Sequence, residues 1–240
     1  MPPPSEPILA IDHLVKRFGG VTAVDDCSFA VKGGGITGLI GPNGSGKTTT
    51  FNVISGLESP DAGSVTFDGT DITRHKPHQV TRLGVGRTFQ ITRVFPEMTV
   101  MENMVVAAPP GDLRAAAGRA IGLLDLIGMG SLRDEFAANL SYGQRKLVEI
   151  ARVHMRPHRI VLLDEPFAGV NRTLANSLIR YLRAMRDQGV TYLIIDHEMR
   201  IIMDLCGYIL VMDQGALLVE GAPEVVQEHP EVMAAYFGRE

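Results

Sequence analysis

Residues 41–48 carry the glycines, the lysine and the hydroxyl at the spacing that binds a triphosphate. In order they are Gly41, Pro42, Asn43, Gly44, Ser45, Gly46, Lys47 and Thr48. They fit the pattern G-x-x-x-x-G-K-[ST] between a strand-like run at 36–40 and a helix-like run that begins at Thr49. Glycines let successive backbone N–H groups converge on phosphates, and the helix adds the positive end of its dipole. We therefore predict that residues 41–49 bind a nucleoside triphosphate. Lys47 reaches its β and γ oxygens, and Thr48 offers a hydroxyl to Mg²⁺.

Two adjacent carboxylates, Asp164 and Glu165, follow the apolar run at 160–163. A buried strand of this kind delivers side chains to the sheet edge where ligands bind. Asp164 would hold Mg²⁺, directly or through water, and Glu165 would polarise the attacking water. A solvated strand end is the alternative, because acidic residues are common there. The phosphate loop upstream favours the catalytic interpretation.

A third segment reads Leu140-Ser141-Tyr142-Gly143-Gln144 and precedes a run with helical spacing of apolar residues. Ser141 can cap such a helix, and Gln144, three residues on, can close a capping box. On these residues alone, a capped helix without a ligand is a sufficient explanation.

The composition is that of an ordinary soluble globular protein. Of the 240 residues, 45% are hydrophobic and 21% charged, which allows one sizeable core or a core with a subdomain. A net charge of −4 is weak evidence against nucleic acid as the main partner. No apolar run approaches the roughly 18 residues needed to span a bilayer. Residues 1–7 contain neither a basic patch nor an apolar stretch, so we expect a disordered lead and a cytoplasmic protein.

The elements that must position the chemistry alternate between short apolar runs and amphipathic stretches. Runs of strand length lie at 36–40, 160–163, 192–195 and 208–212, and a helical pattern covers 174–188 before Gly189. All-apolar strands between helices indicate a buried, mainly parallel sheet. Further strand patterns at 8–11, 27–31 and 64–67, with a turn around 16–20, indicate an antiparallel β-subdomain.

We therefore predict an α/β fold with a P-loop NTPase core of mainly parallel sheet, an antiparallel β-subdomain and an inserted helical subdomain. Residues 8–240 would form one domain. Within it, residues 8–91 and 157–222 would form the core with its β-subdomain, about 92–156 the helical subdomain, and 223–240 a C-terminal appendage.

The segment at 140–144 resembles the Leu-Ser-Gly-Gly-Gln signature of the ATP-binding cassette (ABC) family, with Tyr142 as a departure at a variable position. In that family the motif contacts the γ-phosphate bound by the other cassette of a dimer. The resemblance thus implies that Ser141, Gly143 and Gln144 bind ATP in trans.

The resemblance extends from about residue 8 to residue 238 and implies further roles. Gln90 matches the glutamine loop, which senses Mg²⁺ and the attacking water, and His197 matches the switch histidine that touches the γ-phosphate. Phe18 matches the aromatic that stacks on adenine; by itself it is equally well explained as packing on its own subdomain. Residues 168–171 correspond to the loop that crosses the dimer interface, with Asn171 where many relatives carry Asp. The implied catalytic set is Lys47, Gln90, Glu165 and His197, and the implied Mg²⁺ set is Thr48, Gln90 and Asp164.

The resemblance implies the ATPase subunit of a membrane transporter, peripheral on the inner face of the membrane, with permease subunits and a second ABC ATPase as partners. A soluble cassette of the DNA-repair or translation type would need a coiled-coil insertion or a second cassette. A cassette that binds nucleotide without hydrolysing it conflicts with the intact Lys47, Glu165 and His197.

Cargo is indicated by residues 87–103, 168–171 and 220–238, which are similar to branched-chain amino-acid importer ATPases, although the stretch after Asn103 is shorter than in many of them. The expected cargo is therefore branched-chain or other hydrophobic amino acids captured by an external binding protein. A urea or amide importer and a lipopolysaccharide exporter stay open. An apolar face of Val94, Phe95, Met98 and Val100 would either accept a coupling helix of the permease or pack the helical lobe.

Overall fold

The computed structural model describes residues 7–89 and 92–237, and two sheets organise it. The larger sheet has the strand order β10-β9-β3-β8-β7-β6. Its strands are β3 (Ile36–Ile40), β6 (Val85–Arg87), β7 (Ile160–Asp164), β8 (Thr191–Ile195), β9 (Tyr208–Asp213) and β10 (Ala216–Gly221). All neighbours pair in parallel except β10, which runs antiparallel to β9 at the edge. The predicted mainly parallel sheet is confirmed.

The smaller sheet is antiparallel and has the order β2-β1-β4-β5. It contains β1 (Leu9–Phe18), β2 (Val21–Val31), β4 (Ala62–Phe67) and β5 (Thr70–Asp71). The turn expected around 16–20 is shorter than predicted, because β1 continues to Phe18 and only Gly19 and Gly20 separate the strands. Gly19 has a φ of 56°, which glycine adopts without steric cost.

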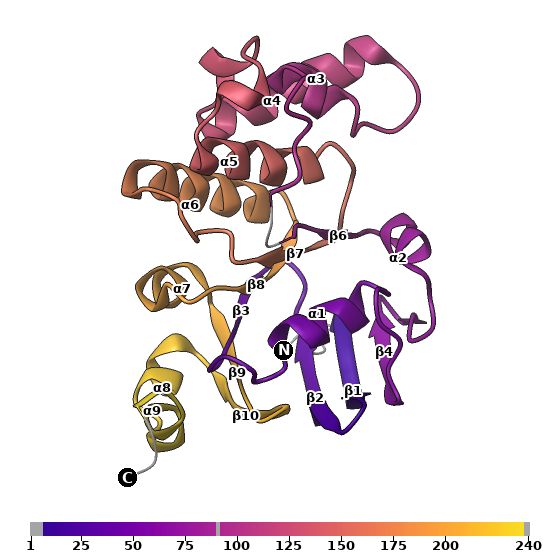
Figure 1. The fold of residues 1–240 in the computed structure, drawn as a ribbon, viewed down its shortest axis with the longest axis vertical. Helices are drawn as coiled ribbons and strands as arrows, with labels where there is room; N and C mark the ends of the chain where they lie inside the picture. Colours follow the sequence, from indigo (N-terminus) through magenta and orange to yellow (C-terminus); the bar gives the residue numbers. More distant parts are fainter. Residues whose placement is uncertain (1–6, 90–91, 238–240) are drawn as a thin grey trace, which may run out of the picture.

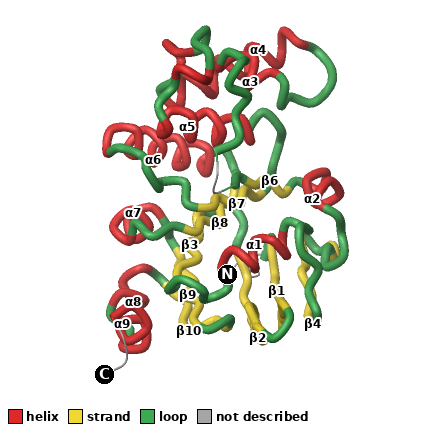
Figure 2. Tube along the Cα trace, viewed as in Figure 1, coloured by secondary structure: helices red, strands yellow, loops and turns green. Residues whose placement is uncertain are grey.

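Helices cover both faces of the larger sheet and gather at one end of the molecule (Figures 1 and 2). They are α1 (Lys47–Ile54), α2 (Pro77–Leu83), α3 (Val100–Val105), α4 (Leu113–Ile127), α5 (Tyr142–Val153), α6 (Arg172–Asp187), α7 (Met199–Leu205), α8 (Pro223–Gln227) and α9 (Pro230–Phe237). Helix α4 packs against α3, α5 and α6. The predicted inserted helical subdomain is the group α3–α5, which connects β6 to β7.

The central strands are buried on both faces because each side of the sheet has its own hydrophobic core. Val161 and Leu163 belong to the core shared with α4, α5 and α6. Ile160 and Leu162 alternate with them and belong to the core shared with α1 and the antiparallel sheet. This double burial explains why the strands read as continuous apolar runs.

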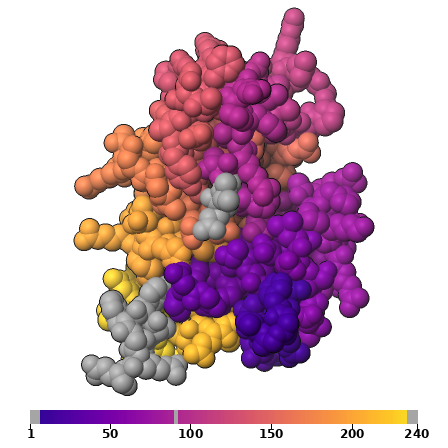
Figure 3. Space-filling view, viewed as in Figure 1, coloured from indigo at the N-terminus to yellow at the C-terminus, as the bar shows by residue number. Residues whose placement is uncertain are grey.

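The two sheets are joined where β2 meets the turn between β9 and β10. Asp25 N donates to Gly215 O at 2.9 Å, and Gly215 N donates to Ser45 O at 3.1 Å. In Figure 3 the N-terminal strands, in indigo, accordingly lie against the orange-yellow part of the chain. Strand β10 is absent from our sequence prediction, and it is the strand that brings this turn to the phosphate loop.

Candidate nucleotide-binding and catalytic site

The loop between β3 and α1 contains glycines at positions where no side chain fits. A Cβ on Gly41 would lie 2.1 Å from Met212 O, and a Cβ on Gly46 would lie 2.4 Å from Ala23 O. Gly46, the N-cap of α1, also has a φ of 99°. The backbones of β9 and β2 thus pack directly on the loop and fix its shape. Helix α1 begins at Lys47, two residues before the predicted start, so the N-terminal end of α1 faces the loop.

Lys47 is buried and holds its ammonium against the loop. Its Nζ donates to Gly41 O and Pro42 O, both at 2.8 Å, and to Ser45 Oγ at 3.3 Å. Burial lowers the pKa of this lysine, and the nearby carboxylates of Glu165 and Asp164 oppose that shift. The charge balance at the loop therefore depends on Asp164, the last residue of β7, and on Glu165, which follows it.

A cavity of about 460 Å³ lies over this loop. Its lining residues come from β2, the loop, α1 and the ends of β7 and β8: Val21, Thr22, Ala23, Asn43, Gly44, Ser45, Gly46, Lys47, Thr48, Thr49, Glu165, Ile195 and His197. The structure therefore brings residues 43–49, Glu165 and His197 to one space. Parallel pairing of β7 with β8, with Asp164 opposite Ile195, places their carboxyl ends together.

Glu165 is held in a strained backbone conformation beside His197. Its φ is 49°, in the left-handed region that costs a non-glycine residue about 1–2 kcal/mol. Its N–H donates to Ile195 O at 2.7 Å, and Glu165 Oε1 lies 3.1 Å from His197 Nε2. Such strain concentrates at functional sites, where the surrounding structure imposes it. The main-chain bond ties the backbone of Glu165 to the end of β8.

Asp164 is buried at the end of β7 and has Arg87 as its ion-pair partner. Asp164 Oδ2 lies 3.7 Å from Arg87 Nη2, and the Asp164 N–H donates to Thr88 Oγ1 at 3.3 Å. Burial raises the pKa of this carboxyl, and the guanidinium of Arg87 opposes the shift. The sequence predicts no role for Arg87. Its only signal in the sequence is its position before Thr88 and Phe89, since the pairing with Asp164 requires β6 and β7 to be neighbours.

Asp196, also without a predicted role, joins the two loops that carry Glu165 and His197. Its Oδ2 accepts from Phe167 N at 2.9 Å, while its Oδ1 accepts from His197 N at 2.8 Å and Glu198 N at 3.0 Å. A buried carboxylate with three N–H donors is well satisfied and fixes both loops. An acidic residue directly before His197 at a strand end is the signal that could have identified it.

The segment at 140–144 forms the capping box that its sequence predicts. Ser141 N donates to Gln144 Oε1 at 2.8 Å, and Gln144 N donates to Ser141 Oγ at 3.3 Å. A Cβ on Gly169 would lie 3.0 Å from the ring of Tyr142, so this ring covers the loop at 168–171, where Asn171 caps α6. Ser141, Gly143 and Gln144 are not among the described residues that line the cavity.

Two predicted residues remain. Phe18 ends β1 with 46% of its surface exposed and pairs with Val21, which lines the cavity. Phe18 itself is not among the described residues that line the cavity, and Lys16 Nζ lies 5.0 Å from the centroid of its ring. Gln90 lies outside the described residues.

Comparison with known proteins agrees with this geometry. The family described as "ABC transporter" matches residues 24–168. The chain is 38% identical to the "Probable branched-chain amino acid transport ATP-binding protein LivG" of Archaeoglobus fulgidus, covering 96% of this chain and 95% of that protein. It is 37% identical to the "High-affinity branched-chain amino acid transport ATP-binding protein BraF" of Pseudomonas aeruginosa, covering 98% and 99%.

A solved structure of the ADP conformation of an ATP-binding cassette of an ABC transporter matches with a TM-score of 0.88 and 34% identity. The match covers 98% of this chain and 100% of that chain. Full-length similarity therefore accompanies the nucleotide loop, the paired carboxylates and the capped signature helix. The chain belongs to the ABC transporter family, and it is an ABC ATPase.

Proposed function

We propose that the cavity over the phosphate loop hydrolyses ATP with Glu165 as general base and His197 as its partner at the γ-phosphate. The observation that carries this proposal is the 3.1 Å contact between Glu165 Oε1 and His197 Nε2 in the same cavity as Lys47. A water beside Glu165 would give up a proton to the carboxylate as it attacks. Lys47 would exchange its bonds to the loop carbonyls for phosphate oxygens, and residues 41–49 would surround the triphosphate.

Mg²⁺ fits the residues at this site. Thr48 lines the cavity, and Asp164, a buried carboxylate, directly precedes the lining residue Glu165. Mg²⁺ prefers oxygen ligands and takes one or two from protein, with the rest from phosphates and water. Thr48 and Asp164 would hold the ion, which neutralises charge on the transferred phosphoryl group when bound. Gln90 stays the third proposed ligand.

The ATPase works as a dimer in this proposal, with a second cassette, identical or related, as the partner. Ser141, Gly143 and Gln144 are not among the described lining residues of the chain's own cavity. The capping box uses the Ser141 oxygen as an acceptor, which leaves its O–H available as a donor. The N-terminal end of α5 would then face the γ-phosphate of the other cassette.

Substitution of Glu165 by Gln tests both the general-base role of Glu165 and the proposed dimer. It keeps the shape and the backbone conformation but removes the base, so turnover should fall roughly a hundredfold or more while ATP binding persists. Gel filtration with Mg-ATP should show a larger species for this variant than for the wild type. Wild-type hydrolysis by the purified variant would contradict the assignment.

Branched-chain or other hydrophobic amino acids are the proposed cargo. Two relatives that match almost the full chain are named as branched-chain amino acid transport ATP-binding proteins. Among residues 7–89 and 92–237, no helix has the length and apolar character needed to cross a membrane. The proposal therefore includes separate permease subunits, an external binding protein and a place for this chain on the inner face of the membrane. No nucleic acid is proposed as a partner.

The cargo proposal is tested by uptake of labelled leucine, isoleucine and valine in cells with and without this chain. We expect uptake to be lost in cells without the chain. The wild-type chain should restore it, and Glu165→Gln should not. Unchanged uptake would contradict the cargo while leaving the ATPase assignment in place. Uptake of a urea or amide, or export of lipopolysaccharide, would then be measured in the same cells.

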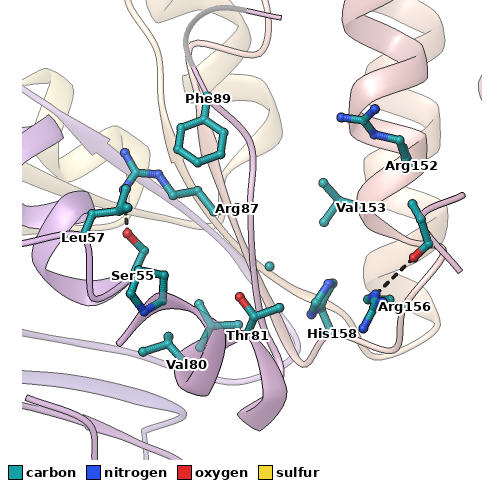
Figure 4. A pocket seen from close by; sticks show the side chains of 14 residues that line it. Ser55, Leu57, Val80, Thr81, Arg87, Phe89, Arg152, Val153, Arg156 and His158 are labelled. Atoms are coloured by element: carbon teal, nitrogen blue, oxygen red, sulfur yellow. Dashed lines mark hydrogen bonds between the residues drawn. The ribbon is translucent and has the colours of Figure 1, made fainter. Parts of the chain in front are cut away.

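We place the permease contact at a pocket of about 310 Å³ between α2, β6 and α5 (Figure 4). Of the predicted apolar face, Val100 is fully buried and Val94 packs on the core, so these two serve the helical lobe. Phe95 is 51% exposed, and its ring lies 5.5 Å from Arg152, which lines the pocket. Phe95 is therefore the exposed member of this face next to a lining residue, although it does not itself line the pocket.

The chemistry of the pocket favours a permease segment that carries a carboxylate. Arg87, Arg152 and Arg156 line it, and no described lining residue is acidic. Among the described residues, the buried Arg152 Nη1 and His158 Nδ1 have no hydrogen-bond partner. An apolar segment with one acidic residue would pair with the arginines of this pocket. Arg156→Glu should therefore reduce co-purification with the permease pair, whereas Arg180→Glu, on the exposed side of α6, should not.

A further inference from the structure

Arg87 connects the pocket of Figure 4 to the nucleotide-binding half of the core. It is the last residue of β6, its side chain is only 9% exposed, and it lines the pocket. Its Nη1 donates to Ser55 Oγ at 2.6 Å, and its Nη2 donates to Asn52 Oδ1 at 2.8 Å. The dashed line at Ser55 in Figure 4 marks this bond. Both acceptors belong to α1 or its C-cap, and α1 begins at the phosphate loop.

The same guanidinium faces the acidic end of β7. Arg87 Nη2 lies 3.7 Å from Asp164 Oδ2, and the Asp164 side chain is only 5% exposed. Water screens such a buried pair little, so the position of the guanidinium strongly affects the carboxylate. A guanidinium is planar and rigid, and two bonds to α1 therefore fix where its charge lies. Arg87 Nε has no hydrogen-bond partner among the described residues.

We propose that Arg87 is a positioning residue for Asp164: its bonds to Ser55 and Asn52 fix the guanidinium that faces the carboxylate. The inference rests on the proposed role of Asp164 as a Mg²⁺ ligand. Arg87 itself touches neither ATP nor the attacking water in this scheme.

The test compares Arg87→Gln with Arg159→Gln. Arg159 forms an exposed ion pair with Asp68 and lies just before β7, so its substitution breaks another Arg–Asp pair at the opposite end of the same strand. Affinity for ATP is measured with EDTA and with Mg²⁺, and the gain caused by Mg²⁺ is the main readout. For Arg87→Gln we expect unchanged affinity in EDTA, a Mg²⁺ gain at least threefold smaller, and a kcat lower by about 10-fold to 100-fold.

Arg159→Gln should match the wild type in all three measurements. Arg87→Lys, which keeps the charge but cannot hold both α1 acceptors and Asp164, should fall between wild type and Arg87→Gln. A Mg²⁺ gain in Arg87→Gln equal to that of the wild type would overturn the inference. Asp164→Asn distinguishes failure of the Arg87 inference from failure of the proposed Mg²⁺ role of Asp164. If this variant too leaves the Mg²⁺ gain unchanged, the proposed role of Asp164 itself is wrong.

Ser55→Ala keeps the test decisive if Arg87→Gln fails to fold. It removes the Arg87 Nη1 acceptor while leaving Arg87 and Asp164 in the chain. We expect the Mg²⁺ gain to fall, but by less than in Arg87→Gln, and the affinity in EDTA to stay unchanged. An unchanged Mg²⁺ gain in folded Ser55→Ala would count against positioning through α1 and would overturn the inference in that case.

Discussion

Glu165 should be a residue at which function and stability conflict, and glycine and alanine substitutions can separate the two. A φ of 49° costs a residue with a Cβ about 1–2 kcal/mol, whereas glycine adopts it freely. Glycine also loses more chain entropy on folding, and this loss cancels about 0.5–1 kcal/mol of the gain from relieved strain. Glu165→Gly should therefore be more stable than Glu165→Ala by about 1 kcal/mol. At a residue with ordinary helical or strand dihedrals, the glycine variant would be the less stable one.

The comparison with alanine removes the side-chain contribution, because both variants lose the contact with His197 and both keep the N–H bond to Ile195 O. Thermal unfolding of the nucleotide-free protein should place Tm of Glu165→Gly roughly 2–4 °C above that of Glu165→Ala. Both variants should lose a hundredfold or more in kcat. A glycine variant equal to or less stable than the alanine variant would refute the claim that the backbone at Glu165 is strained.

Three other predictions concern ATP binding by Lys47 and Ser141, the backbone of the phosphate loop at Gly46, and the buried His154. Lys47→Ala should weaken ATP binding itself, while Ser141→Arg should keep ATP affinity and lose activity; equal losses of affinity in equilibrium binding would show that Ser141 acts in its own cassette. Gly46→Ala should cost about 2 kcal/mol or more of unfolding free energy in urea titrations, because its Cβ would lie 2.4 Å from Ala23 O at a φ of 99°. Burial lowers the pKa of His154 to about 4, below its unfolded value of 6.5. Its stabilising effect is therefore complete above pH 6.5 and is lost as the pH falls toward 4. His154→Gln should show a decrease in unfolding free energy between pH 7 and pH 4 that is about 3 kcal/mol smaller than in the wild type.

The site residues adjacent in sequence were predictable because their chemistry is local. Residues 41–48 carry their register in the chain itself, and the capping box of Ser141 and Gln144 needs only a helix that begins between them. The strands before Asp164 and His197 were recognisable because burial on both faces makes them apolar throughout. Roles in trans came from family resemblance, since one chain contains no geometry for a dimer.

Elements without a continuous apolar run were harder to predict. Strand β10 lies at the sheet edge and is only half-buried, and β6 has three residues, so neither gives a strong periodic signal. The turn around 16–20 was predicted too long because Lys16 and Arg17 are polar. Both nevertheless continue β1, where Lys16 forms an ion pair with Glu58 and the Arg17 N–H donates to Asp61.

The sequence by itself determined the α/β class, the phosphate loop and the paired carboxylates at the end of β7, because each depends on residues close together in the chain. Only the tertiary structure decided that Arg87 faces Asp164, that Asp196 ties Phe167 to His197, and that Val100 packs inward. These contacts join residues 29 to 77 positions apart or depend on which strands are neighbours. Strand order and packing are set by the burial of the whole core, and no local pattern of residues encodes them.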